Sequence, residues 1–253
     1  MLGRTILYCG GESNTEKHSD CYSYHMDHEG ATWEQSASMV YTRYVFSLLA
    51  IGGKAFALGG RGTFGREYEE VTVEAFTPGE GWKIRNDMRL PSITAHHCSV
   101  VAIGSRIITI GGHVAGTSNS NQVLQFDLDH PGYGWNRLER TKKGRQHHGC
   151  TVGTYQGQQG IFVTGGSNKG HNQVEFFVNA ARKWRDVIPS MSSNRYYHTS
   201  STIGGALYSH GGSGSEGTQE FFNETSAVWT LSNLQRKRRY HTSVSLPEGI
   251  ISC

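Results

Sequence analysis

An arginine three residues before a histidine occurs three times in the second half of the sequence. The pairs are Arg145/His148, Arg195/His198 and Arg238/His241. Earlier in the chain Arg43 has Phe46 at the histidine position, and His97 has Thr94 at the arginine position. A guanidinium can bind a carboxylate through two parallel hydrogen bonds, and imidazole is a common metal ligand. The pattern therefore raises two kinds of chemistry, recognition of acidic groups and metal binding.

Three other landmarks recur with the same period as these pairs. The first is a diglycine after a short apolar run: Gly10-Gly11, Gly59-Gly60, Gly111-Gly112, Gly165-Gly166 and Gly211-Gly212. The second is an aromatic residue that ends an extended run: Tyr24, Phe76, Phe126, Phe177 and Phe222. The third comprises all five tryptophans of the chain: Trp33, Trp82, Trp135, Trp184 and Trp229. Successive diglycines start 49, 52, 54 and 46 residues apart, so the chain is a repeat.

The composition restricts the class of protein that this repeat builds. The 253 residues include 33 glycines but only five prolines, which disfavours linkers and disordered sequence. No run of about 18 apolar residues is present, so no segment is expected to span a membrane. The formal net charge of +3 is too small to indicate nucleic-acid binding by itself. The composition favours an all-β domain.

A period of about 50 residues with short strands is typical of a β-propeller blade. The order of apolar run, diglycine, aromatic, tryptophan and Arg-x-x-His resembles the Kelch repeat, and it covers essentially the whole chain. The resemblance implies an all-β propeller of four-stranded antiparallel blades. We therefore predict a single domain over residues 1–253, with five repeats visible.

Two ways of closing the ring are compatible with the sequence. Residues 5–36 are expected to form the second to fourth strands of a blade, and full units begin near 44, 97, 148 and 198. A first-type strand at 241–246 could complete a five-bladed ring. In the other repeats the diglycine begins 13 to 17 residues after the position of the landmark histidine. Counted from His241, a sixth diglycine would begin just after Cys253. This spacing favours a fragment of a six-bladed ring, truncated at its carboxyl end.

The segments between blades carry most of the positive charge. Segments 39–45, 86–96, 138–147, 190–197 and 233–240 hold eleven Lys or Arg and two acidic residues, a sum of +9. We predict a basic channel mouth for an acidic partner segment, formed by Arg43, Arg145, Arg195, Arg238, Arg239, Tyr196 and Tyr240. The resemblance implies this function, because Kelch adaptors of ubiquitin ligases bind acidic peptides through arginines at the same position of the repeat. The alternative is that these arginines recur with the repeat and bind backbone carbonyls between blades.

The histidines favour packing over metal binding. They occur once per blade, and no carboxylate recurs in the same phase, so no metal or other cofactor is expected. No Ser-His-Asp motif, phosphate-binding loop or paired-carboxylate motif is present. The expected function is a non-catalytic protein-protein interaction module. Carbohydrate binding or sugar processing is the alternative, favoured if Tyr41, Tyr44, Tyr196, Tyr197 and Tyr240 are exposed near the channel.

Cys9 and Cys21 lie at the two sides of one predicted hairpin. They could face each other across it and form a disulfide, which would indicate an oxidising compartment. Asn223-Glu224-Thr225 is a glycosylation sequon on a predicted turn. The two features favour a secreted protein over a cytoplasmic one.

Overall fold

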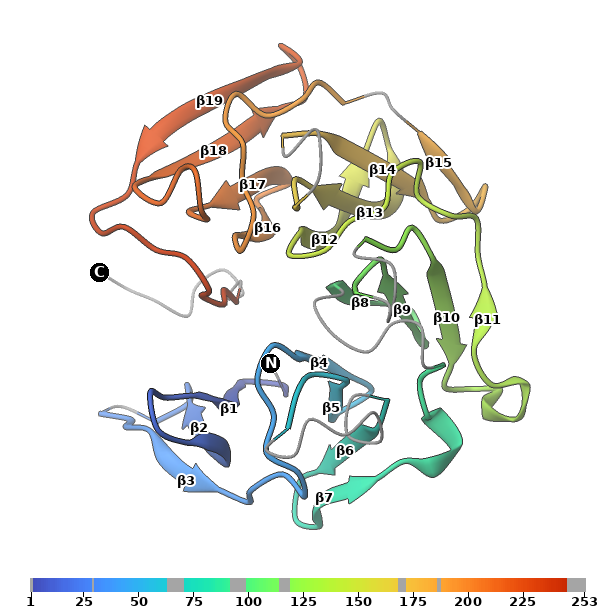
Figure 1. Cartoon of the computed structure of the whole chain (residues 1–253), viewed down its shortest axis with the longest axis vertical. Coiled ribbons are helices and arrows are strands. Elements are labelled where there is room, and N and C mark those ends of the chain that lie inside the picture. The colour runs from blue at the N-terminus through green and yellow to red at the C-terminus, as the bar shows by residue number, and fades with distance from the viewer. Residues whose placement is uncertain are drawn as a thin grey trace.

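The chain folds as a ring of antiparallel β-sheets. The computed structural model describes residues 2–28, 30–62, 71–91, 99–113, 119–167, 172–185 and 188–244. Five sheets follow one another around a central axis (Figure 1), four of them with four strands and the first with three. The predicted all-β propeller is confirmed. None of the helices among the described residues is long and apolar enough to cross a membrane.

Each sheet is a meander of strands that are consecutive in sequence. The first contains β1 (Thr5–Glu12), β2 (Lys17–His25) and β3 (Glu34–Ser36). The second contains β4 (Ser47–Ile51), β5 (Lys54–Leu58), β6 (Val73–Thr77) and β7 (Gly81–Ile84). The third contains β8 (Ser99–Ile103), β9 (Arg106–Ile110), β10 (Val123–Asp127) and β11 (Asn136–Arg137). The fourth contains β12 (Gly149–Tyr155), β13 (Gln158–Thr164), β14 (Val174–Val178) and β15 (Lys183–Arg185). The fifth contains β16 (Thr199–Ile203), β17 (Ala206–His210), β18 (Thr218–Asn223) and β19 (Val228–Asn233), and two 3-10 turns, η1 (Asn86–Met88) and η2 (Pro131–Tyr133), lie after β7 and β10.

The ring is open between the fifth sheet and the first (Figure 1). The sequence predicted a strand over 241–246 that would pair with β1. Residues 241–244 are not in a strand, and 245 and 246 lie outside the described residues. The first sheet therefore has three strands, with β1 at its inner edge. The prediction of a closing strand is wrong for the described part of that segment, because no ladder hydrogen bonds form there.

The diglycines require a backbone that only glycine adopts easily. Gly111 and Gly112 have φ values of +64° and +103°, and the other four pairs are similar. A Cβ on Gly111 would lie 2.6 Å from the carbonyl oxygen of Arg145, in the segment that leads to the next sheet. The glycines therefore permit both the turn and the close approach of two sheets.

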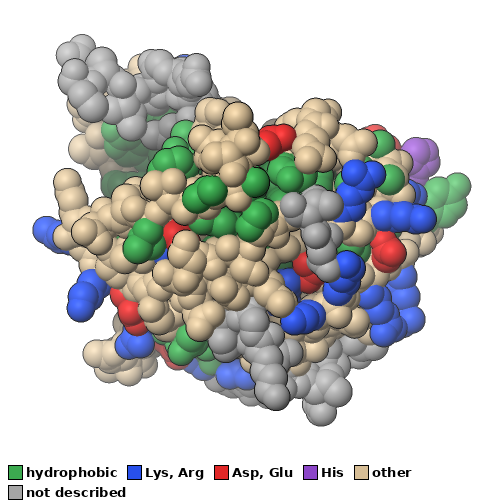
Figure 2. Space-filling view, turned by 90° about the horizontal axis from the view of Figure 1, so that it is seen from above, with side chains coloured by type: hydrophobic (Ala, Val, Ile, Leu, Met, Phe, Trp, Pro, Cys, Tyr) green, Lys and Arg blue, Asp and Glu red, His purple; other side chains and the backbone are tan. Residues whose placement is uncertain are grey.

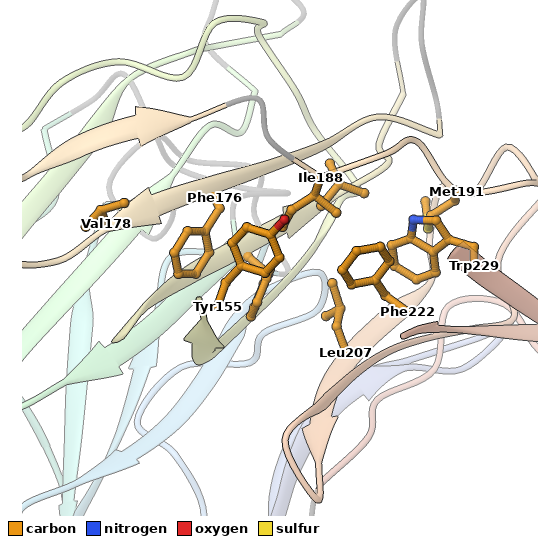
Figure 3. Packing of buried hydrophobic residues seen from close by; sticks show 10 residues of the cluster. Tyr155, Phe176, Val178, Ile188, Met191, Leu207, Phe222 and Trp229 are labelled. Atoms are coloured by element: carbon orange, nitrogen blue, oxygen red, sulfur yellow. The ribbon is translucent and has the colours of Figure 1, made fainter. Parts of the chain in front are cut away.

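The core consists of apolar layers between neighbouring sheets. Between the fourth and fifth sheets, Tyr155, Phe162 and Phe176 pack against Phe222 and Trp229 (Figure 3). Each strand aromatic contacts the tryptophan of its own sheet, with ring centroids 5.1 to 5.6 Å apart. Burying one such side chain stabilises the fold by roughly 1.5–3 kcal/mol. One sheet alone cannot bury the apolar side chains on both of its faces, so the stacking of neighbouring sheets removes them from solvent.

Cys9 and Cys21 face each other across β1 and β2 and form a disulfide. Both side chains are buried against the second sheet. The bond closes a loop between residues 12 apart, which stabilises the folded state by about 3 kcal/mol in the chain-entropy model. We expect reduction to lower the free energy of unfolding by about this amount, as measured by urea denaturation with and without reductant.

Alkylation followed by intact-mass measurement tests the bond directly. The denatured chain has five cysteines and should accept two more labels after reduction than before it. The double variant Cys9→Ser, Cys21→Ser should show no such difference, and its stability should not depend on reductant. Equal label counts for the unmodified protein in both conditions would exclude the disulfide.

Candidate functional site: the segments between sheets

Three of the five arginines predicted to line a basic channel mouth are buried. Arg43, Arg145 and Arg195 expose 1%, 4% and 0% of their surface. Each forms an ion pair with a buried glutamate, in the order Glu74, Glu175 and Glu220. A buried, paired guanidinium is not available to a partner. The prediction that these three residues bind an acidic segment is therefore wrong, and the alternative of pairing with backbone carbonyls is supported.

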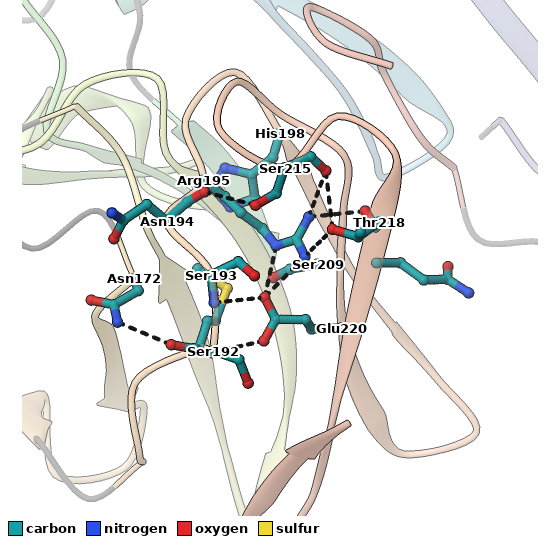
Figure 4. A network of polar contacts seen from close by, with 12 residues as sticks. Asn172, Ser192, Ser193, Asn194, Arg195, His198, Ser209, Ser215, Thr218 and Glu220 are labelled. Atoms are coloured by element: carbon teal, nitrogen blue, oxygen red, sulfur yellow. Dashed lines mark hydrogen bonds and ion pairs between the residues drawn. The ribbon is translucent and has the colours of Figure 1, made fainter. Parts of the chain in front are cut away.

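The Arg195 site shows the arrangement in detail (Figure 4). Its Nε and Nη2 donate to one carboxylate oxygen of Glu220 at 3.0 and 2.9 Å. Its Nη1 donates to the carbonyl oxygens of Gly211 and Thr218 at 2.8 and 2.9 Å. Glu220 also accepts the backbone N–H groups of Ser192 and Ser193. Each charge thus has several partners, as burial requires.

The same arginines also join neighbouring sheets through their carbonyl groups. The carbonyl oxygen of Arg195 accepts the N–H of Gly166, in the diglycine of the fourth sheet, at 2.9 Å. Its guanidinium binds the diglycine of the fifth sheet. Arg43 and Arg145 make the equivalent contacts, to Gly11 and Gly112 through the carbonyl and to Gly59 and Gly165 through the side chain. We call this set of contacts the arginine bridge.

The sequence interpretation missed the glutamates, although a signal was present. Each stands two residues before the strand aromatic: Glu74 before Phe76, Glu175 before Phe177, and Glu220 before Phe222. In the third repeat the equivalent residue is the buried Leu124, and its arginine position holds Thr94, which lies outside the described residues. In the four repeats whose two positions both lie in the sequence, arginine and glutamate are thus present together or absent together, because either charge alone would be buried without compensation.

A second contact between sheets involves the tryptophans. The indole N–H of Trp135 donates to the carbonyl oxygen of Met88 at 2.9 Å. Trp184 and Trp229 donate in the same way to Glu139 and Pro189. Each acceptor lies just after the last strand of the preceding sheet. We call this contact the tryptophan bridge, and it gives the indole N–H a function in these three sheets, whereas the buried indole nitrogen of Trp82 has no hydrogen-bond partner.

The cations that remain exposed lie elsewhere in these segments. Arg236, Lys237, Arg238 and Arg239, the basic run, are all exposed after β19. Arg140, Lys142 and Lys143 are exposed after β11. On the side seen in Figure 2, Lys and Arg side chains gather toward the right-hand end, where β11 and β15 lie in Figure 1. Within the described residues, no ion pair involves the basic run. Among the segments between sheets, most of the exposed positive charge therefore lies in these two.

Aromatic side chains beside the basic run form a stack. The ring centroids of His147 and Tyr240 both lie 3.9 Å from that of Tyr197, and we call these three residues the rim stack. All three have φ values between +53° and +57°, a strained conformation for residues other than glycine. Backbone N–H groups of Tyr197 and Tyr240 donate to the carbonyl oxygens of His147 and Tyr197. Val45 has the same backbone conformation without an aromatic ring, so the fold does not require one.

The tyrosines predicted near the channel differ in exposure. Tyr240 is 63% exposed, whereas Tyr41, Tyr44, Tyr196 and Tyr197 are half-buried. Burial, followed by contact with Tyr240, raises the pKa of Tyr197. Its phenol therefore stays protonated at neutral pH and can donate to Nε2 of His147, 3.0 Å away. Of the predicted binding residues, Arg238, Arg239 and Tyr240 are exposed together, with the guanidinium of Arg239 5.8 Å from the Tyr240 ring centroid.

Two of the landmark histidines are packing residues, and His97 lies outside the described residues. His148 and His198 are buried, and Nε2 of His198 lies 2.8 Å from the hydroxyl of Thr164. Burial, followed by the nearby positive charges of Arg145 and Arg195 respectively, lowers the pKa of both imidazoles. Among the described residues no three His, Cys, Asp or Glu side chains are placed to hold a metal ion.

Comparison with known proteins agrees with this geometry. No family model matches the chain. A putative F-box/kelch-repeat protein of Arabidopsis thaliana is 33% identical over 103 residues, which is 40% of this chain and 26% of that protein. The matched repeats are similar to Kelch repeats. The solved structure of YjhT matches this propeller with a TM-score of 0.70 and 16% identity, over 92% of this chain and 82% of that chain. The chain thus spans about a quarter of the curated relative's length, and the likeness to YjhT concerns the fold.

Proposed function

We propose that this Kelch propeller is a non-catalytic interaction module that binds an acidic protein segment beside the basic run. Arg236, Lys237 and Arg239 are the residues assigned to binding, together with the exposed ring of Tyr240. Kelch-repeat proteins in general bind proteins, which supports the class of partner. Residues of this kind, one aromatic anchor among exposed cations, suit a peptide that carries carboxylates.

The exposure of three unpaired cations next to an exposed tyrosine carries this proposal. A surface arginine normally contributes little to stability, so the fold does not explain four consecutive basic residues. Clustered positive charge raises the local potential and accelerates the approach of an acidic partner. The ring of Tyr240 would then supply apolar contact area at a small entropic cost.

Affinity capture at low and moderate salt tests the proposal. The triple variant Arg236→Gln, Lys237→Gln, Arg239→Gln should lose most of the bound protein, and the unmodified chain should lose it as salt rises, because screening weakens exposed charges. A matched variant, Lys54→Gln, Arg137→Gln, Lys183→Gln, removes three exposed cations from the strands and their turns and should bind normally. Equal capture by both variants, or capture that is independent of salt, would contradict the proposal.

The rim stack favours a second candidate, binding of a carbohydrate. Stacked tyrosines with one exposed ring can hold the apolar face of a sugar, and the cations nearby would select an acidic one. The same capture experiment separates the candidates. Retention of anionic polysaccharide, with no protein bound, and its loss in Tyr240→Ala would favour the sugar.

A further inference from the structure

The basic run lies in a segment without regular secondary structure. Residues 234–244, which follow β19 on the open side of the ring, belong to no strand or helix (Figure 1). All four side chains of the run are exposed. Exposed irregular segments are the places where proteases cut folded chains. The run is therefore accessible as a stretch of peptide as well as a charged surface.

Three backbone hydrogen bonds hold residues 236–240 to the rest of the described chain. The N–H of Arg238 donates to the carbonyl oxygen of Glu216 at 2.8 Å, and its carbonyl oxygen accepts the N–H of Gly212 at 2.9 Å. The N–H of Tyr240 donates to the carbonyl oxygen of Tyr197 at 3.1 Å. Lifting this segment from the surface breaks no strand ladder, so its local opening costs less free energy than the opening of a strand.

The other adjacent basic residues are held more firmly. They occur at two places, Lys142-Lys143 and Arg182-Lys183. The N–H of Lys142 donates to the buried carboxylate of Glu175 at 2.8 Å, and the hydroxyl of Thr141 donates to the carbonyl oxygen of Lys143 at 2.9 Å. Lys183 lies in β15 and pairs with β14. Within the described residues, only the basic run combines adjacent cations with a segment free of such restraints.

The disulfide between Cys9 and Cys21 indicates an oxidising compartment, such as the secretory route of a cell. Serine endoproteases that act along this route select runs of basic residues and hydrolyse the bond after the last arginine. Acidic side chains in the cleft of such an enzyme bind each guanidinium through charge-assisted hydrogen bonds. The basic run offers arginine at its first, third and fourth places. Its composition, its exposure and the disulfide thus agree on one class of enzyme.

We propose that the basic run is a processing site, where a serine endoprotease of this class hydrolyses the peptide bond between Arg239 and Tyr240. The oxygen of one water joins the carbonyl carbon of Arg239, and the bond from that carbon to the nitrogen of Tyr240 breaks. The two protons of the water leave Arg239 with a carboxylate and Tyr240 with an ammonium group. Cys9 and Cys21 both precede the cut, so their disulfide does not join the products. This cleavage is independent of the binding proposed above, because it is read from the masses of the fragments.

Incubation of the folded, unreduced chain with a purified kexin-type endoprotease, which requires paired basic residues, tests the proposal. Mass spectrometry should show a cut after Arg239 and none at Lys142-Lys143. Arg239→Gln should abolish the cut. Arg236→Gln should slow it roughly tenfold, because one charge-assisted contact with the enzyme is lost. The matched variant Lys142→Gln, Lys143→Gln should be cut at the rate of the unmodified chain.

Trypsin separates recognition of the run from mere accessibility, since it cuts after any accessible lysine or arginine. It should also cut the folded chain within residues 236–240. A run that trypsin cuts and the kexin-type enzyme leaves intact would overturn the proposal. Resistance of the run to both enzymes would overturn it too, because the segment would then open less readily than its three hydrogen bonds indicate. Cleavage of Arg239→Gln at the unmodified rate would have the same consequence.

Discussion

Replacing Arg195 by alanine is expected to lower the free energy of unfolding by roughly 3–5 kcal/mol. The substitution leaves the carboxylate of Glu220 buried without its counter-charge. It also removes donors from the carbonyl oxygens of Gly211 and Thr218. The loss should appear as a lower urea midpoint with an unchanged slope.

Two control variants identify the cause of this loss. Arg238→Ala removes the equivalent but exposed arginine and should change stability by no more than about 0.5 kcal/mol. The double variant Arg195→Met, Glu220→Leu removes both charges, as in the third repeat, where Leu124 is buried. It should be more stable than Arg195→Ala alone. If the double variant is the less stable of the two, the uncompensated charge is not the cause.

Acidification is expected to destabilise the propeller well before its carboxylates become protonated. Burial lowers the pKa of His198 from the ordinary 6.5 to about 3 and also lowers that of His148. Below about pH 6.5 the unfolded chain binds protons that the folded chain excludes, so the free energy of unfolding falls as pH falls. For His198 this loss is about 1.4 kcal/mol per pH unit, or about 2 kcal/mol at pH 5, and the lowered pKa of His148 acts in the same direction.

The variant His198→Asn tests the source of this pH dependence. Its stability is expected to fall less steeply between about pH 6.5 and pH 4 than that of the unmodified chain, in urea denaturation at a series of pH values. His130→Asn, which removes an exposed imidazole, should retain the original slope. A slope that His198→Asn does not reduce would show that its buried imidazole is not responsible. Besides burial, electrostatic interactions with Arg195, His241 and His210 lower the pKa of His198. These neighbours stay in place in His198→Asn, so the change in slope reports the imidazole of His198 alone.

The sequence was informative wherever one residue type has one physical use. A diglycine allows positive φ and close approach, and its repetition about every 50 residues predicts stacked sheets without any knowledge of contacts. Cys9 and Cys21 were recognised because they flank one hairpin. The same reasoning failed for Arg43, Arg145 and Arg195, since an arginine in a loop is compatible with either a surface or a buried ion pair.

The repeat by itself determined the fold class, the strand order within each sheet and the residues between sheets, because these depend on local periodicity. Only the tertiary structure decided which charges are free. Glu220 and Arg195 are 25 residues apart, and whether they meet depends on how β18 folds back beside the segment before β16. The tertiary structure also showed the opening between the first and fifth sheets. The exposure of Trp33 and Arg238 depends on which sheets become neighbours in space.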